Sequence, residues 1–161
     1  MKEIKDAQKK WRAAKDAAQA QCETSHQYDL ARKLGECQMF KGDESLEEMI
    51  SLMFSPQGAE FLTTYGFPDL VTFRKFKKYH PERFGVYIDC GEIALRDEKN
   101  VFVVGNTVAR LKYAQTQGNR LILMFGAMAD VDASGFCVVK IERDATSKVE
   151  VNISGHAKVI R

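Results

Sequence analysis

Five basic side chains alternate with aromatic residues in the segment "FRKFKKYHPERF", which runs from Phe73 to Phe84. The basic residues are Arg74, Lys75, Lys77, Lys78 and Arg83. Basic side chains can neutralise phosphates while an aromatic ring stacks on a base, so the segment is a candidate nucleic-acid contact. The alternative is a short helix whose Phe73 and Phe76 face the body of the protein and whose lysines are solvated. Asp69 precedes the segment and Glu82 lies within it, and this compensation of charge favours the alternative.

A metal site is the second candidate. Cys22 and His26 are four residues apart, a spacing that can present two ligands on one face of a helix. Cys37 could join them. A site of this type needs three or four ligands, and no residue supplies a convincing fourth one. We therefore expect neither a bound metal nor another cofactor.

The thiols and carboxylates give little sign of catalysis. Cys90 and Glu92 lie on the same face of an expected strand, and a neighbouring carboxylate raises the pKa of a thiol, which argues against a reactive cysteine. Asp130 and Asp132 share a strand face and could bind a cation or act as acid and base. Their simpler role is to keep an outer strand face soluble. The sequence contains no P-loop, G-x-G-x-x-G, H-E-x-x-H or G-x-S-x-G motif.

Bulk composition is that of an ordinary globular protein. The 161 residues are 45% hydrophobic and 29% charged, with a formal net charge of only +2, so no overall field favours nucleic acid. No segment reaches the roughly 20 apolar residues of a membrane span, and the charged N-terminal segment does not resemble a secretory signal. The four cysteines are scattered and are interpreted as reduced thiols. These features predict a cytoplasmic protein.

The helical elements are expected in the first half of the chain. Residues 1–40 are predicted to form a helical arm, with a narrow apolar stripe that includes Trp11 and an uninterrupted helix that could run on through "YDLARKL". Residues 41–83 are predicted to form short helices packed on the β part. Their start signals are a capping box from Ser45 to Glu48 and the pair of Ser55 as N-cap with Pro56 at the first helical position.

From about residue 84 the apolar residues recur at every second position, the period of a strand, instead of at helical spacing. Units of similar pattern begin at residues 106, 126, 136, 148 and 156, and a further unit is expected in "QTQGNRLILM". Their inward positions are small or β-branched first and aliphatic last. The spacing near ten, with a longer one near twenty, favours a β-solenoid with two strands per coil. A β-sandwich or jelly roll is the alternative, because it also uses short strands every 8–12 residues. The predicted class is therefore α+β, with an all-β domain over residues 84–161.

Self-association is expected because the last unit, "HAKVIR", shows no cap and would leave an unpaired strand edge. The candidate contact residues at that edge are Lys158, Val159, Ile160 and Arg161. Trp11 of the helical arm is the other candidate. The sequence thus predicts a homo-oligomer.

Several stretches resemble a group of small proteins carried by phages and mobile elements of gut bacteria. They include "MFSPQGAEFL", "YGFPDLVTFRKF", "FGVYIDCGEIAL", "VGNTVARL" and "ILMFGAMADVDASGFCVVKIE", and the resemblance covers roughly residues 45–161. That group has no assigned reaction or catalytic residues. The resemblance implies a mobile-element origin and a helical lead-in followed by strand repeats.

The function expected from these observations is a non-enzymatic protein-interaction module that acts on a protein of the host cell. One alternative is a nucleic-acid-binding accessory factor that uses the basic segment. The other is a small enzyme with Cys90, Glu92 or the pair Asp130 and Asp132 in a cleft.

Overall fold

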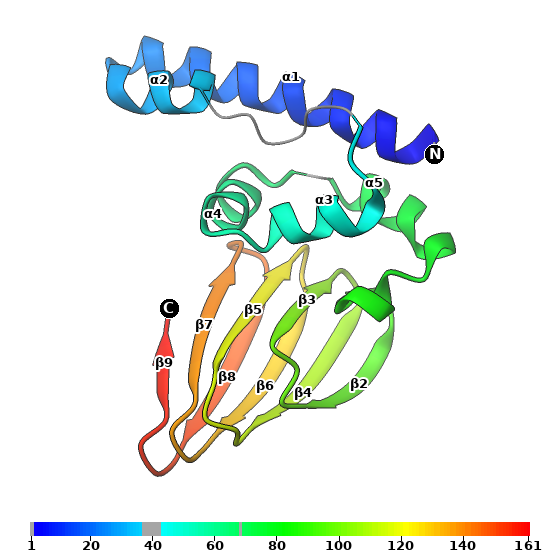
Figure 1. The fold of residues 1–161 in the computed structure, drawn as a ribbon, viewed down its shortest axis with the longest axis vertical. Helices are drawn as coiled ribbons and strands as arrows, with labels where there is room; N and C mark the ends of the chain where they lie inside the picture. The colour runs from blue at the N-terminus through cyan, green and yellow to red at the C-terminus, as the bar shows by residue number, and fades with distance from the viewer. Residues whose placement is uncertain (1, 37–42, 68) are drawn as a thin grey trace. The chain divides into compact units, whose positions relative to one another are not determined.

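A computed structural model of the chain describes residues 2–36, 43–67 and 69–161 (Figure 1). The chain forms two compact units with their boundary between Thr72 and Phe73. The first unit contains α1 (Lys2–Thr24), α2 (Tyr28–Glu36), α3 (Leu46–Met53) and α4 (Pro56–Tyr65). Helix α5 (Leu70–Phe76) crosses the boundary.

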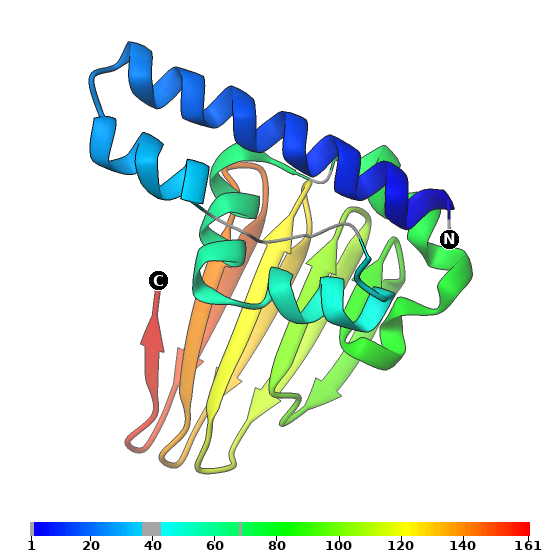
Figure 2. The same ribbon diagram turned by 45° about the horizontal axis from the view of Figure 1, so that its top comes forward.

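Helices α1 and α2 form a hairpin in which α2 folds back along α1 (Figure 2). The expectation of one continuous helix through "YDLARKL" is wrong, because His26 adopts a left-handed conformation with φ of 60°. The N–H of Gln27 donates to the carbonyl of Cys22 at 2.8 Å, which closes the helix end in a Schellman-type turn. Histidine thus fills a position that glycine usually occupies.

Trp11 lies inside the first unit. Its ring centroid is 4.3 Å from that of Phe61 and 5.6 Å from that of Phe67, and only 3% of the residue is exposed. The prediction that Trp11 mediates self-association is therefore not supported, since the ring is used by an internal aromatic core. Aromatic pairs of this kind stabilise a core beyond their buried area.

The helix starts in the first unit follow their sequence signals. Ser45 accepts from the N–H of Glu48, and the Glu48 carboxylate accepts from the N–H of Ser45 at 2.7 Å, so the predicted capping box is present. Ser55 caps α4 in the same way through the N–H of Gly58. Each cap satisfies backbone donors that the helix itself leaves open.

The second unit begins with the last turn of α5 and the 3₁₀ helices η1 (Lys77–Tyr79) and η2 (Pro81–Phe84). Nine strands follow: β1 (Val86–Ile88), β2 (Gly91–Arg96), β3 (Asn100–Val104), β4 (Thr107–Tyr113), β5 (Gly118–Met124), β6 (Met128–Ala133), β7 (Val138–Arg143), β8 (Lys148–Ile153) and β9 (Lys158–Ile160). Phe73 packs edge-on against Phe102 of β3, with 5.2 Å between the ring centroids.

The strands form a β-solenoid of about four turns. One sheet has the order β1-β3-β5-β7-β9 and the other β2-β4-β6-β8, and every neighbouring pair is parallel (Figure 1). Helices followed by a solenoid confirm the predicted α+β class and exclude the β-sandwich alternative, whose sheets are antiparallel.

The coil length is constant after the first turn. Val108 pairs with Met128, and Met128 pairs with Lys148, so one coil is 20 residues long. In the first coil Val86 pairs with Phe102, an offset of 16 residues. Strand β5 lies in the stretch "QTQGNRLILM", which confirms the additional unit expected there.

The interior is filled by small and aliphatic residues that stack from coil to coil. In the row Leu95, Leu111, Val131 and Val151, the two middle residues are fully buried and the two end residues are only partly buried. The interior column therefore continues to both ends of the stack without being fully covered there.

Carboxylates from the end coils hold the turns of the inner coils. Asp97 accepts from the N–H groups of Ala114 and Gln115 at 2.6 and 3.0 Å, and Asp144 accepts from the N–H of Phe125 at 2.7 Å. Asp89 accepts in the same way from the N–H of Asn106 at 2.9 Å. These backbone N–H groups in the turns cannot bond within the parallel sheets, so carboxylates of a neighbouring coil accept their hydrogen bonds.

Candidate interaction surfaces at the ends of the solenoid

The basic segment is held partly by its own unit. Arg74 donates to Asp89 with 2.7 Å between Nε and Oδ2, and Lys77 donates to the backbone carbonyl of Asp89 at 3.2 Å. The hydrogen bond from Arg74 lowers the pKa of Asp89 more strongly than partial burial raises it. Two of the five basic side chains therefore already have an acidic residue as partner.

Phe73 and Phe76 face the body of the protein, as in the alternative interpretation of this segment as a short helix with solvated lysines. Phe73 and Phe76 are buried, with 2% and 3% exposed, so neither ring is presented to a base. Lys78 lies over the ring of Tyr79 and Arg83 over that of Phe84. Lys75 is also exposed. The five basic side chains therefore lie along one segment, but the rings of Phe73 and Phe76 are buried.

Cys22 and His26, two of the three candidate metal ligands, lie in different settings. Cys22 is buried in α1, whereas His26 lies beyond the helix end and shares a 2.8 Å hydrogen bond with the hydroxyl of Tyr28. Cys37 lies outside the described residues. Within the described ranges, no group of three or more histidine, cysteine or acidic residues is placed to hold a metal ion.

Cys90 has a raised thiol pKa, as expected, but for a different reason. Burial is the main cause, and the largest carboxylate contribution comes from Glu82, whereas Glu92 is not among the causes. Glu92 points to the outer face of β2 and lies 3.6 Å from Arg110. The thiol is therefore unsuited to act as a nucleophile near neutral pH.

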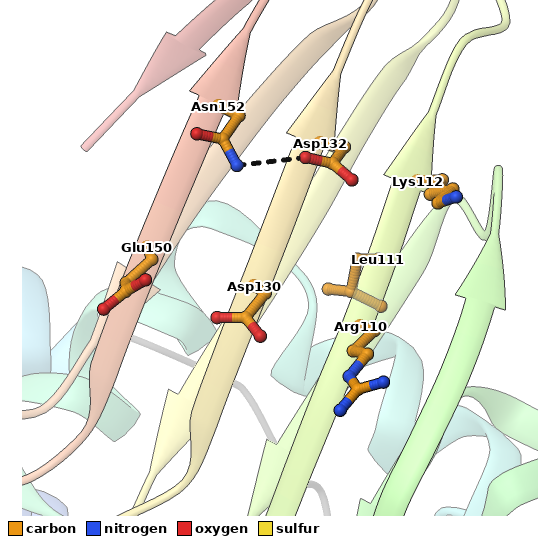
Figure 3. Close-up of a pocket in the computed structure, with 7 residues that line it drawn as sticks. All are labelled: Arg110, Leu111, Lys112, Asp130, Asp132, Glu150 and Asn152. Carbon is orange, nitrogen blue, oxygen red and sulfur yellow. Dashed lines mark hydrogen bonds between the residues drawn. The ribbon is translucent and has the colours of Figure 1, made fainter.

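Asp130 and Asp132 lie on the exposed outer face of β6, as the simpler interpretation of these residues predicted. They line a depression of about 360 Å³ between β4, β6 and β8, together with polar side chains of the neighbouring strands (Figure 3). Asp132 accepts from Asn152 at 3.1 Å. Arg110 and Lys112 lie on the same face, so the surface is a mixed-charge strand face rather than an acidic cleft.

The last described coil has a strand edge without a partner among the described strands. Among the described strands, β8 pairs only with β6, and β9 pairs only with β7. The N–H of Lys148 bonds to Ala127 and that of Lys158 to Cys137. Because backbone groups of successive strand residues point to opposite sides, the unpaired groups belong to Val149, Val151 and Val159.

The side chains around this edge are largely apolar. Ile153 and Ile160 are 55% and 51% exposed, and Val149, Val151 and Val159 are partly buried. Phe136 is 64% exposed and stacks on His156 with 4.7 Å between the ring centroids. Lys158 and Arg161, both exposed, are the cations of the predicted edge. The sequence did not single out Phe136 and His156 as a pair, although they are 20 residues apart and so occupy equivalent turns.

The first coil exposes a second edge. Strand β2 pairs only with β4 among the described strands (Figure 1). The N–H groups of Gly91 and Asp97 both bond to the β4 side. By the same alternation, the unpaired backbone groups belong to Glu92, Ala94 and Arg96, which are all exposed.

No known protein family, curated protein or solved structure gives a significant match to this chain. In the part of the chain that the structure describes, no helix combines the length and apolar character needed to cross a membrane.

Proposed function

We propose that this protein is a non-enzymatic interaction module that binds a partner protein at the open edge formed by β8 and β9. The observation that carries the proposal is the combination of unpaired backbone groups with a partly exposed interior row at Val149, Val151 and Val159. An extended segment of a partner can add a strand to such an edge, with backbone hydrogen bonds for affinity and side-chain contacts for specificity.

The geometry defines the chemistry of the partner segment. Its residues that lie directly opposite Val149 and Val151 would place their side chains on the same face as these valines, over the interior row, so they are expected to be small or aliphatic. On its outer side the segment would lie beside Lys148, Glu150 and Asn152 of β8, which favours polar residues there. The partner is thus an extended segment that alternates aliphatic and polar residues.

The biological setting of the proposal comes from the resemblance to small proteins of phages and mobile elements. On this basis we propose that the module acts on a host protein in the cytoplasm of a host cell. The candidates for chemistry do not compete with this proposal: the pKa of the Cys90 thiol is raised by burial, and Asp130 and Asp132 lie on an exposed strand face.

The test compares two proline variants in affinity capture from host lysate, with quantitative mass spectrometry. Val151→Pro removes an N–H on the unpaired side of β8, whereas Ala94→Pro removes the equivalent donor at the other end of the same sheet. We expect a protein that is captured by the wild type and by Ala94→Pro and lost with Val151→Pro. Equal capture by all three forms, or none above background, would refute the proposal.

A further inference from the structure

We infer that β2 is a self-pairing edge through which two copies of this chain form a symmetric dimer. In this dimer β2 of one copy runs antiparallel to β2 of the other, and a two-fold axis passes beside Ala94. The inference concerns the opposite end of the solenoid from the partner site, so it does not depend on the proposed function.

The backbone of β2 is arranged for this pairing. The unpaired N–H and C=O groups belong to Glu92, Ala94 and Arg96, because Gly91 and Asp97 direct theirs towards β4. With the axis at Ala94, Glu92 of one copy faces Arg96 of the other and Ala94 faces its own symmetry mate, and all of these residues have unpaired groups. Each of these pairs can therefore exchange two hydrogen bonds, with non-hydrogen-bonded pairs of Ile93 and Leu95 between them, which is the ordinary antiparallel pattern.

The outer side chains match in the same register. Glu92 of one copy faces Arg96 of the other, and the symmetry produces this opposite-charge pair twice. The small side chain of Ala94 faces its own symmetry mate, so nothing bulky meets at the axis. Moving the axis to Ile93 or Leu95 would bring Glu92 opposite Ala94 or Glu98, so only the register centred on Ala94 pairs the charges.

The inner side chains are complementary as well. Ile93 of one copy faces Leu95 of the other, and both are only partly buried in a single chain. Pairing would cover these two residues with aliphatic partners and continue the interior row from one solenoid into the next. Strand β2 contains no lysine or proline and pairs with β4 in an unbroken register, so its charged residues are the pair Glu92 and Arg96, which the dimer would neutralise.

Charge reversal tests the register directly, because the side chains concerned are exposed. The wild type is expected to have the mass of a dimer in light scattering at tens of micromolar. Glu92→Arg and Arg96→Glu each place like charges opposite one another twice, and each should raise the dissociation constant of the dimer by about ten-fold. The double variant Glu92→Arg/Arg96→Glu restores opposite charges and should restore the dimer.

Mixing gives a stricter test of the same pairing. Glu92→Arg and Arg96→Glu are complementary to each other, so an equimolar mixture should form a heterodimer although each variant alone dissociates. Glu150→Lys, on the outer face of the edge strand at the other end, is the matched control and should dimerise like the wild type. A monomeric wild type, loss of the dimer in the control alone, or a double variant that stays monomeric would overturn the inference.

A cross-link locates the axis independently of charge. Directly opposed residues that exchange hydrogen bonds have Cα atoms about 5.5 Å apart, which lies within the range that a disulfide can bridge. Ala94→Cys should therefore form an interchain disulfide on mild oxidation, whereas Arg110→Cys, on the same face one strand inwards, should not. Equal cross-linking of the two variants and the wild type would contradict the placement of the axis.

Discussion

The two ends of the solenoid expose the same kind of strand edge with different side chains beside it. At the β2 end the unpaired backbone groups belong to residues whose side chains point outwards, such as Glu92 and Arg96. At the β8 end they belong to residues of the interior row, such as Val149 and Val151. The difference follows from parallel pairing, in which each residue directs both backbone groups to the same neighbour.

A parallel stack of this kind has a direction, and its two ends cannot be equivalent. The charged β2 edge can select its own copy, because opposite charges two positions on either side of Ala94 repeat under two-fold symmetry. The apolar β8 edge offers mainly shape and hydrophobic contact. The two ends therefore suit different partners. Substitutions in the end coils and in the interior coils are expected to differ in their effect on stability.

The largest expected effect separates the interior row from its end. Leu111 and Leu95 occupy the same inward row, but Leu111 is 1% exposed and Leu95 is only partly buried. Leu111→Ala should lower the free energy of unfolding by about 3 kcal/mol, and Leu95→Ala by about 1 kcal/mol. Denaturant unfolding of the two variants at low protein concentration measures the difference. Equal losses would mean that the first coil is as well covered as the second.

A smaller effect is expected from the carboxylates that the end coils contribute. Asp144→Ala removes the acceptor for the N–H groups of Phe125 and Ser147 and should lower the free energy of unfolding by about 2 kcal/mol. Asp97→Ala acts on the exposed turn at the other end, so its effect should be smaller. Thermal unfolding of both variants checks the order, and a reversed order would contradict the assigned importance of the Asp144 turn.

The smallest effect is the dependence of stability on pH. Burial opposes ionisation of Asp144, but hydrogen bonds from Phe125, Thr146 and Ser147 hold its pKa below the ordinary value. Backbone hydrogen bonds lower the pKa of Asp97 in the same direction. A carboxyl whose folded pKa is lowered contributes stability above its unfolded pKa of about 3.9, and this contribution is lost as the pH falls further.

Hydrogen exchange at pH 7 and near pH 3 measures where this loss occurs. We expect the turns capped by Asp97 and Asp144 to lose protection at low pH, while the interior strands β4 and β6 retain theirs. In Asp144→Asn the turn at Phe125 should already be less protected at pH 7 and should respond less to acid. A uniform loss over all strands would show that the carboxylates do not act locally.

The sequence predicted the β-solenoid and kept the β-sandwich as an alternative. Small and aliphatic residues such as Ala109 and Val131 recur on one face because the interior of a narrow stack admits little else, and this recurrence favoured the solenoid. Alternation of inward and outward residues is the same in parallel and antiparallel sheets, so alternation alone left the sandwich open. Strand β5 is harder to recognise because Ile122 and Met124 on its outer side are buried as well.

Two other features depended on contacts that the sequence does not display. The helix end at His26 was missed because a residue other than glycine occupies the left-handed position. Trp11 was assigned to an interface because its apolar stripe is narrow, whereas Phe61 and Phe67, some fifty residues away, cover it. The complementarity of Glu92 and Arg96 is visible in the sequence as opposite charges on either side of Ala94. It acquires meaning only once β2 is known to be an edge.

Because every coil after the first is 20 residues long, the distance between the two ends of the stack can change only in fixed steps. Each coil adds one strand to each sheet, a step of about 4.8 Å along the stack. Gain or loss of one such coil between β4 and β8 would change the separation of the ends by that step and leave Glu92, Arg96, Val149 and Val151 in their settings. The length of the solenoid and the side chains at its two ends can therefore change independently in evolution.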